Sequence, residues 1–310
     1  MTTAFYSHDD CMKHDMGPDH PESPERLSHI LARLADTPLA QELQWIRPDE
    51  ITREQLLTVH PESYLRQLEE LQPAHGRVFT DEETAMTPTT LRAARLAAGA
   101  CVQAVDRVMA GQSRNAFACV RPPGHHAERT RSMGFCFYNN PALAAQRALA
   151  HDDIERVAII DFDVHQGNGT VDIVGGDERI LMCSSFQHPF FPHSHVYRQA
   201  GNIINVPIEA GCGSEDYRKQ VMDAWQEPLR AFKPQLLVVS AGFDGHRLDP
   251  MGELNLETDD FRWLSQWLVD LAEEFADGRL VSMLEGGYHM GALCDSVIAH
   301  LEVLTTARAG

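Results

Sequence analysis

The 310-residue chain lacks several features that would assign it to a class at once. No apolar run reaches the roughly 18 residues that a membrane-spanning helix needs, which argues against an integral membrane protein. Residues 1–10 have neither a basic start nor an apolar core, so we expect no signal peptide. The seven cysteines include no Cys-x-x-Cys pair, which disfavours a zinc finger or a disulfide framework. Reduced cysteines in a cytoplasmic protein are therefore expected.

Positive charge is also scarce. The chain has 26 Lys and Arg against 45 Asp and Glu, a net charge of −19. Such a balance disfavours binding to nucleic acid, so neither nucleic acid nor a membrane is an expected partner. Assembly into a homo-oligomer stays possible, because composition does not decide it.

Apolar runs typical of strands alternate with helical patterns from about Asn115 onward. Strands are predicted at 116–121, 157–163, 180–185, 203–208, 236–242 and 280–287, and helices at 141–150, 214–231, 257–276 and 290–306. This alternation indicates βαβ units and a parallel sheet with helices on both faces. The first 112 residues are predicted to be mainly helical, notably 24–35 and 89–109. We therefore expect one α/β domain over residues 1–310.

The stretch VAIIDFDVHQGNGT (157–170) begins as a buried strand and continues with Asp161, Asp163 and His165. Side chains alternate across a strand, so these three are predicted to point the same way. Two carboxylates and an imidazole at the end of a buried strand suggest a functional site.

Three other predicted strands also end in polar groups: His125-His126, Asp244 and Tyr288. Ligands of open parallel sheets bind beyond the carboxyl ends of the strands, so these groups are expected to converge. Asp163, His165 and Asp244 would then form a three-ligand divalent metal site, which suits Zn²⁺ and also Fe²⁺. The histidine pair and the tyrosine stay free for proton transfer and carbonyl polarisation. Together these are the parts of a metal-assisted amide hydrolase.

Other interpretations start from the same residues. A single Asp or His at a strand end is more often a cap or loop residue than a ligand. Asp-x-Asp after a buried strand also opens the active site of magnesium-dependent haloacid-dehalogenase-type phosphatases, with Asp161 as nucleophile, but the histidines would then have no task. A di-manganese ureohydrolase would need further carboxylates, which are not evident around 161–170 and 244–249. A catalytically silent protein on the same fold would be signalled by loss of a ligand or of Tyr288.

Several motifs closely resemble the zinc-dependent histone deacetylase family. They are HPESPERL (20–27), RPPGHHA (121–127), GFCFYNN (134–140), DFDVHQGNGT (161–170), SAGFDGHRLDP (240–250) and LEGGY (284–288). The resemblance implies the arginase-like deacetylase fold, a single α/β domain. It also implies hydrolysis of an N-acyl amide on a lysine side chain or similar amine, with acetylpolyamine hydrolysis as the alternative.

The resemblance also implies roles for individual residues. Zinc would be held by Asp163, His165 and Asp244. The catalytic set would be His125, His126, Tyr288, Asp161 behind His125, and Asn168 behind His126, an asparagine typical of the class II-like branch. A structural potassium ion would be held by the carbonyls of Asp161, Asp163, His165 and Ser185, with the Asp161 carboxylate and the Ser184 hydroxyl. Walls of a narrow substrate tunnel would be Gly134, Phe135, Phe191, Met251 and Gly286.

Three positions depart from the family pattern. FFPHSHV (190–196) lacks the glycine that many members have after Phe-Phe-Pro, and Phe186 stands where a histidine is expected. Met251 stands where polyamine-specific members have a glutamate that pairs with a second ammonium group. An apolar residue there favours acyl-lysine substrates. The remaining part of the substrate is expected to be a peptide, a protein or a small amine.

Overall fold

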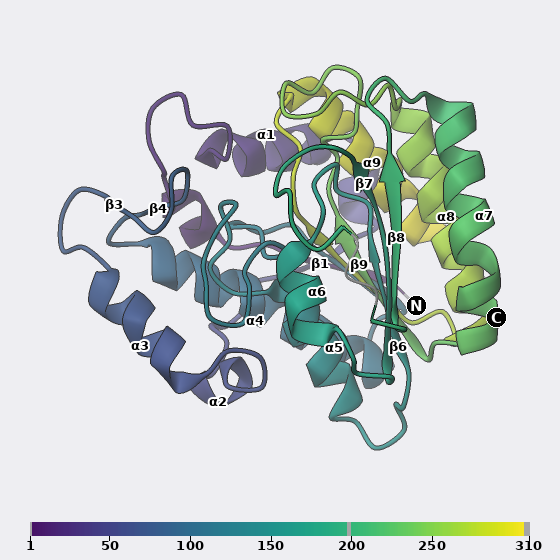
Figure 1. Cartoon of the computed structure of the whole chain (residues 1–310), viewed down its shortest axis with the longest axis horizontal. Helices are drawn as coiled ribbons and strands as arrows, with labels where there is room; N and C mark the ends of the chain where they lie inside the picture. The colour runs from purple at the N-terminus through teal and green to yellow at the C-terminus, as the bar shows by residue number, and fades with distance from the viewer. Residues whose placement is uncertain (1, 197–199, 307–310) are drawn as a thin grey trace.

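The computed structural model describes residues 2–196 and 200–306 (Figure 1). Its centre is an eight-stranded sheet in the order β2-β1-β5-β10-β9-β6-β7-β8, in which every neighbouring pair is parallel. The strands are β1 (Thr3–Tyr6), β2 (Gln44–Ile46), β5 (Asn115–Ala118), β6 (Val157–Asp161), β7 (Ile180–Gln187), β8 (Ile203–Ile208), β9 (Leu236–Ala241) and β10 (Leu280–Leu284). The predicted parallel α/β domain is thereby confirmed.

Helices cover both faces of this sheet. The main ones are α1 (Pro24–Ala35), α3 (Glu62–Leu71), α4 (Thr90–Met109), α5 (Asn140–Leu149), α6 (Asn168–Val174), α7 (Ser214–Phe232), α8 (Thr258–Phe275) and α9 (Met290–Thr306). In Figure 1 α4, α5 and α6 lie on one side of the sheet, and α7 and α8 lie on the other, where α8 packs on α9. None of the helices within 2–196 and 200–306 is long and apolar enough to cross a bilayer.

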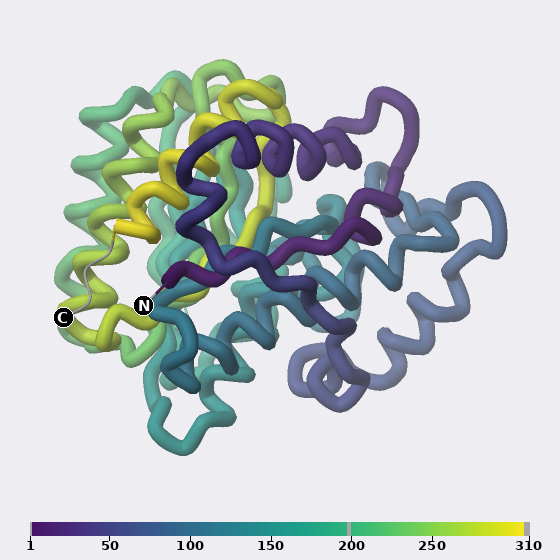
Figure 2. The backbone as a smooth tube through the Cα atoms, turned by 180° about the vertical axis from the view of Figure 1, so that it is seen from behind, coloured from purple at the N-terminus to yellow at the C-terminus, as the bar shows by residue number. Residues whose placement is uncertain are grey.

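The two ends of the described chain meet at one side of the sheet (Figure 2). The Thr3 hydroxyl in β1 donates to the Leu304 carbonyl in α9 over 3.1 Å, and the Asn115 amide in β5 donates to the same carbonyl over 2.9 Å. The short elements are the 3₁₀ helices Asp9–Lys13 and Pro38–Gln41, α2 (Arg53–Leu56), and the antiparallel pair β3 (Val78–Phe79) and β4 (Ala85–Met86). The β3–β4 hairpin lies beside the cavity described below.

The structure differs from the sequence prediction at two short N-terminal strands and at the ends of two later strands. Strands β1 and β2 were not predicted, because they have four and three residues and their pattern is too short to distinguish from a loop. Strand β5 ends at Ala118 and β10 at Leu284, three residues earlier than predicted in each case. The chain leaves the sheet there and enters the loops that build the functional site.

Candidate functional site

The candidate site lies at the carboxyl ends of the central strands, and its first feature is the loop after β6. The strand ends at Asp161, so the predicted strand alternation through residue 165 is wrong. Instead the Asp163 N–H donates to Asp161 Oδ1 over 3.1 Å, and the His165 N–H donates to Asp163 Oδ1 over 2.9 Å. Local side-chain-to-backbone hydrogen bonds therefore orient these side chains, as they commonly do where Asp follows a strand.

Three buried side-chain atoms that could hold a metal ion meet beyond this loop. His165 Nδ1 lies 3.0 Å from Asp163 Oδ1 and 3.1 Å from Asp244 Oδ2. Ligands about 2.0–2.2 Å from a tetrahedral zinc ion lie about 3.3–3.6 Å apart, so these atoms are close enough together to bind one such ion. The donor set of two carboxylates and one imidazole also suits a divalent ion that keeps an open position for substrate.

Each carboxylate is held by a backbone donor from another loop. The Gly286 N–H donates to Asp163 Oδ2 and the Val164 N–H donates to Asp244 Oδ1, both over 2.8 Å. Burial and the nearby Asp163 carboxylate raise the pKa of Asp244 to about 7. A divalent cation bound here would offset the charge of the two buried carboxylates, which is a second indication that the residues fit a metal ion.

Gly286, predicted as a tunnel wall, lies instead behind the two carboxylates. A Cβ atom at this position would overlap Asp244 Oδ2 and Asp163 Oδ2. The glycine is required because the backbone of the loop after β10 passes directly against the two carboxylates, and its N–H donates to Asp163.

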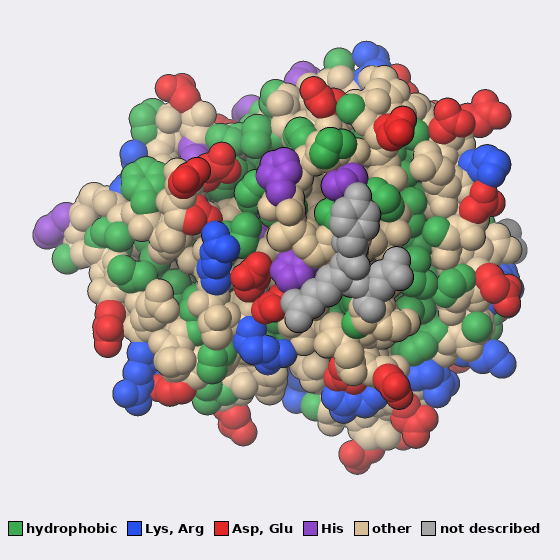
Figure 3. Space-filling view, in the orientation of Figure 1, with side chains coloured by type: hydrophobic (Ala, Val, Ile, Leu, Met, Phe, Trp, Pro, Cys, Tyr) green, Lys and Arg blue, Asp and Glu red, His purple; other side chains and the backbone are tan. Residues whose placement is uncertain are grey.

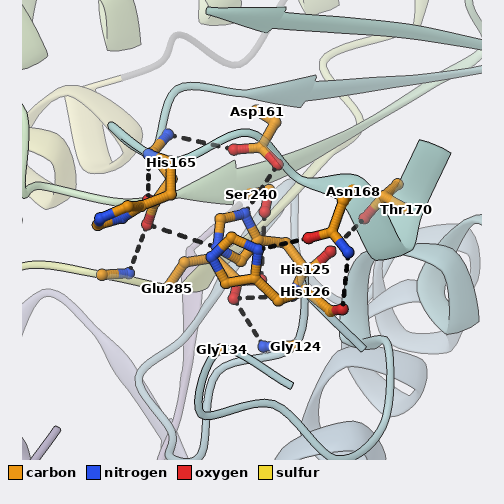
Figure 4. Close-up of polar contacts among 12 residues, drawn as sticks. Gly124, His125, His126, Gly134, Asp161, His165, Asn168, Thr170, Ser240 and Glu285 are labelled. Atoms are coloured by element: carbon orange, nitrogen blue, oxygen red, sulfur yellow. Dashed lines mark hydrogen bonds and ion pairs between the residues drawn. The ribbon is translucent and has the colours of Figure 1, made fainter. Parts of the chain in front are cut away.

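The tandem histidines lie beside the ligand atoms with different partners (Figure 4). His125 Nδ1 is 3.1 Å from Asp161 Oδ2, whereas His126 Nδ1 is 2.8 Å from Asn168 Oδ1. Burial disfavours the charged form of both rings. For His125 the Asp163 and Asp161 carboxylates outweigh burial and raise its pKa to about 10. For His126 burial and the charge of His125 hold the pKa well below its usual value.

Glu285 fixes the loop that carries the histidines, a role that sequence reasoning missed although the residue lies inside the LEGGY motif. Its Oε2 accepts from the Gly124 N–H over 2.6 Å and from the His125 N–H over 3.1 Å. Its Oε1 accepts from the Ser240 hydroxyl over 3.2 Å. A fully buried carboxylate thus connects β9, the loop after β10 and the histidine loop.

Tyr288 is positioned through its backbone and its ring. Its N–H donates to Asp249 Oδ2 over 2.6 Å, and the Arg26 guanidinium lies 4.9 Å above its ring. Arg26 also donates to the Gly287 carbonyl over 2.6 Å. Burial raises the pKa of the Tyr288 hydroxyl well above 10, although Arg26 opposes this shift. The hydroxyl therefore keeps its proton and can act as a hydrogen-bond donor.

A buried charge cluster lies behind this tyrosine and accounts for the HPESPERL motif. Glu22 accepts from Arg121 through both carboxylate oxygens, at 2.5 and 2.7 Å, and from Arg26 at 3.1 Å. His14 Nε2 lies 3.6 Å from the same carboxylate. All four side chains are fully buried, so one carboxylate compensates two guanidinium groups.

A cavity of about 200 Å³ leads to the ligand atoms. It is lined by Glu83, His126, Gly134, Phe135, His165, Phe190, Phe191, Pro250, Met251 and Tyr288. Four of the five predicted tunnel residues are among them. Phe190 was not predicted, and its ring stacks on His165 with 5.4 Å between centroids. In the space-filling view, histidine side chains stand near the centre of this face with acidic side chains beside them (Figure 3).

The loop at 190–196 closes one side of the cavity without the expected glycine. His193, at the position after Phe-Phe-Pro, has φ +59°, a left-handed conformation that glycine adopts more easily. The chain therefore keeps the glycine-like backbone at this position. Phe186, in place of a histidine, is buried in β7.

The predicted potassium ligands lie on β6, its following loop and β7. Asp161 and Ser184 are in register on the neighbouring strands. Ser184 Oγ is buried and has no hydrogen-bond partner among the described residues, as expected of a group that would face a cation. The Ser185 hydroxyl instead pairs with the Tyr217 hydroxyl over 2.9 Å, which leaves the Ser185 carbonyl as its predicted ligand atom.

Comparison with known proteins gives a consistent result over nearly the whole chain. A family model described as a histone deacetylase domain matches residues 20–304. A probable deacetylase of Archaeoglobus fulgidus is 35% identical over 94% of this chain and 83% of its own length. The histone deacetylase-like amidohydrolase of Pseudomonas aeruginosa is 34% identical, over 99% and 87%. The crystal structure of the HDA15 HD domain matches with a TM-score of 0.92 at 32% identity, over 100% of this chain and 90% of that one. This protein therefore belongs to the histone deacetylase family, as its motifs predicted.

Proposed function

We propose that this chain is a zinc-dependent amidohydrolase that removes acetyl or other acyl groups from lysine side chains or similar amines. One juxtaposition supports the proposal most directly. His126, Tyr288 and His165 line one cavity, and Asp163 and Asp244 lie within hydrogen-bond distance of His165.

Asp163, His165 and Asp244 would hold the ion. A bound divalent ion would supply Lewis acidity toward the acyl carbonyl and would lower the pKa of water in the site. His126, held neutral by burial, accepts the proton of the water that attacks the carbonyl carbon. The same proton then passes to the nitrogen of the departing amine, so that a carboxylic acid and a free amine leave the site.

His125 and Tyr288 stabilise charge in this scheme without a net proton transfer. His125, paired with Asp161, stays cationic and lies 3.9 Å from Asp163 through its Nε2, where it offsets negative charge. The Tyr288 hydroxyl donates a hydrogen bond to the carbonyl oxygen as negative charge develops there.

The walls of the cavity suit an extended alkyl chain. Phe135 and Phe191 supply aromatic rings on its sides, and a Cβ at Gly134 would overlap the His126 ring, so only glycine fits there. Met251 offers no charge to a second ammonium group, which favours acyl-lysine in a peptide or protein over an acetylpolyamine. The acetylpolyamine remains the alternative substrate.

Further parts of the proposal concern the ions and the compartment. Fe²⁺ could replace Zn²⁺, because the donor set has mixed nitrogen and oxygen ligands. Potassium beside β6 would hold the Asp161 carboxylate, and the unpartnered Ser184 hydroxyl supports this part of the proposal.

The seven free cysteines suit a reducing compartment such as the cytoplasm. A homo-oligomer remains possible.

The phosphatase alternative is disfavoured by the position of Asp161. Its carboxylate is fully buried and is engaged by the His125 ring and the Asp163 N–H, so it cannot act as a nucleophile toward a substrate in the cavity.

A turnover panel tests the proposal. Acetyl-lysine peptides, longer acyl-lysine peptides, mono-acetylated polyamines and a phosphate monoester are compared after loading with zinc or ferrous iron. His126→Ala should lower kcat on the best acyl substrate by about 10²-fold or more, and His125→Ala by less, at equal metal content. Turnover of the phosphate ester alone would overturn the proposed chemistry, and a larger loss in His125→Ala would reverse the roles of the two histidines.

A further inference from the structure

The side-chain amide of Asn168 is surrounded by partners that determine which way it points. Its Nδ2 donates to Glu128 Oε1 over 2.9 Å and to the Met133 sulfur over 3.2 Å, and lies 3.5 Å from the His126 carbonyl. All three are acceptors. A flipped amide would place Oδ1 against a carboxylate, a thioether and a carbonyl, none of which can donate.

Glu128 is the strongest of these acceptors because it is a carboxylate, and hydrogen bonds to carboxylates are about twice as strong as hydrogen bonds between neutral groups. It follows Ala127 directly after the tandem-histidine motif and has 21% of its side chain exposed. His195 Nε2 lies 3.7 Å from the same oxygen, on the side of the 190–196 loop. Glu128 itself does not line the cavity, so its influence on the site would pass through Asn168.

With Nδ2 committed to Glu128, only Oδ1 of Asn168 can face His126. Because Oδ1 is solely an acceptor, His126 must carry its proton on Nδ1, at the observed 2.8 Å. The neutral ring then has its lone pair on Nε2, the other ring nitrogen. Reversal of the amide would put the proton on Nε2 and leave no free lone pair toward the substrate.

We infer that Glu128 is a positioning residue that sets the amide of Asn168 and thereby the tautomer of His126. The inference rests on the proposed role of His126 as the proton acceptor. It also explains why an asparagine, and not an aspartate, stands at 168: an aspartate there would lie within hydrogen-bond distance of the Glu128 carboxylate and would have no proton to donate. Glu128 and Asn168 are thus a matched acceptor–donor pair.

The test compares four variants with the wild type. Glu128→Gln keeps the length of the side chain and one acceptor oxygen, so kcat should stay within about threefold of wild type. Glu128→Leu removes the acceptor, and kcat should fall about 10-fold with KM changed less than twofold. Asn168→Asp should be more severely impaired, because two carboxylates then face each other. In the double variant Asn168→Asp with Glu128→Gln, the new amide can donate to the carboxylate introduced at position 168, and kcat should recover at least 10-fold over Asn168→Asp alone.

A spectroscopic readout separates positioning from catalysis. Long-range ¹H–¹⁵N correlation spectra of protein labelled in its histidine rings report which nitrogen of His126 carries the proton, and its signals are identified by their loss in His126→Ala. Wild type and Glu128→Gln should show one tautomer with the proton on Nδ1, whereas Glu128→Leu should show a mixture. Glu178→Gln, which changes an exposed glutamate beyond α6, is the matched control. It should change neither kcat nor the spectrum.

Two results would overturn the inference: an unchanged His126 tautomer in Glu128→Leu, or a double variant no better than Asn168→Asp. A changed tautomer in Glu128→Leu with unchanged kcat would support the positioning by Glu128 and would overturn His126 as the proton acceptor. Circular dichroism and thermal melts establish that each variant is folded before comparison.

Discussion

Replacement of Glu22 by glutamine should destabilise the protein far more than an ordinary carboxylate-to-amide change. Glu22 is fully buried and accepts from both Arg26 and Arg121. The amide would keep the size of the side chain but would leave two buried guanidinium groups without a counter-charge. Breaking one partner of a buried ion pair typically costs about 3–5 kcal/mol.

The lowered pKa of Glu22 gives an independent measure of how much this carboxylate stabilises the fold, and it predicts how that stabilisation depends on pH. Burial alone would raise this pKa, but Arg121 and Arg26 outweigh burial and lower it from 4.5 to about 2. A carboxylate with a depressed pKa stabilises the fold above its unfolded pKa and loses this contribution as pH falls through the folded value. This pKa shift corresponds to about 3 kcal/mol of folding stability at neutral pH, of which about 1.5 kcal/mol is lost by pH 3.5.

Urea unfolding of wild type and Glu22→Gln at pH 7 and at pH 3.5 measures both quantities. We expect a difference in the free energy of unfolding of about 3–5 kcal/mol at pH 7 that narrows on acidification. Glu25→Gln, on the exposed side of α1, is the matched control and should change stability by about 0.5 kcal/mol or less. A difference below about 1 kcal/mol at pH 7, or one that does not narrow at pH 3.5, would refute this account of the cluster.

Three further changes have defined outcomes. Met251→Glu should raise kcat/KM on acetylpolyamines relative to acetyl-lysine peptides, because a carboxylate at the cavity can pair with a distal ammonium group. An unchanged ratio of the two kcat/KM values would show that residue 251 does not contact the distal part of the substrate. Gly286→Ala should abolish zinc retention, because the added methyl group would displace both of the proposed carboxylate ligands. Metal analysis of the folded protein measures this. Gly213→Ala, where the added methyl group meets open space, is the control and should retain the metal. Burial lowers the pKa of His300 to about 3, so this side chain stays neutral in the folded protein while it binds a proton in the unfolded chain as pH falls. Between pH 7.5 and pH 5 the free energy of unfolding of wild type should therefore fall by about 2 kcal/mol more than that of His300→Gln, as measured by urea unfolding. An equal fall in the two proteins would contradict this.

Much of the fold and the chemistry could be predicted from the sequence because the relevant signals are local. The apolar runs that became β6 and β9 are each contained in a few residues, and a strand buried on both faces is recognisable from composition alone. The types of candidate ligand were recognisable for the same reason, since carboxylates and imidazoles followed those runs directly. A strand as short as β1 carries no such signal, and it is defined by its pairing with β2 and β5.

Only the tertiary structure decided which side chains meet and what each one faces. Asp244 reaches His165 because β6 and β9 pair in parallel register, a contact between residues 79 positions apart. The local loop after β6, and not strand alternation, aims Asp163 at the same point. Glu128 contacts Asn168 across 40 positions, and the sequence contains no pattern that links the two. Such pairings depend on strand register and on loops folding against each other, which no short stretch of the chain specifies by itself.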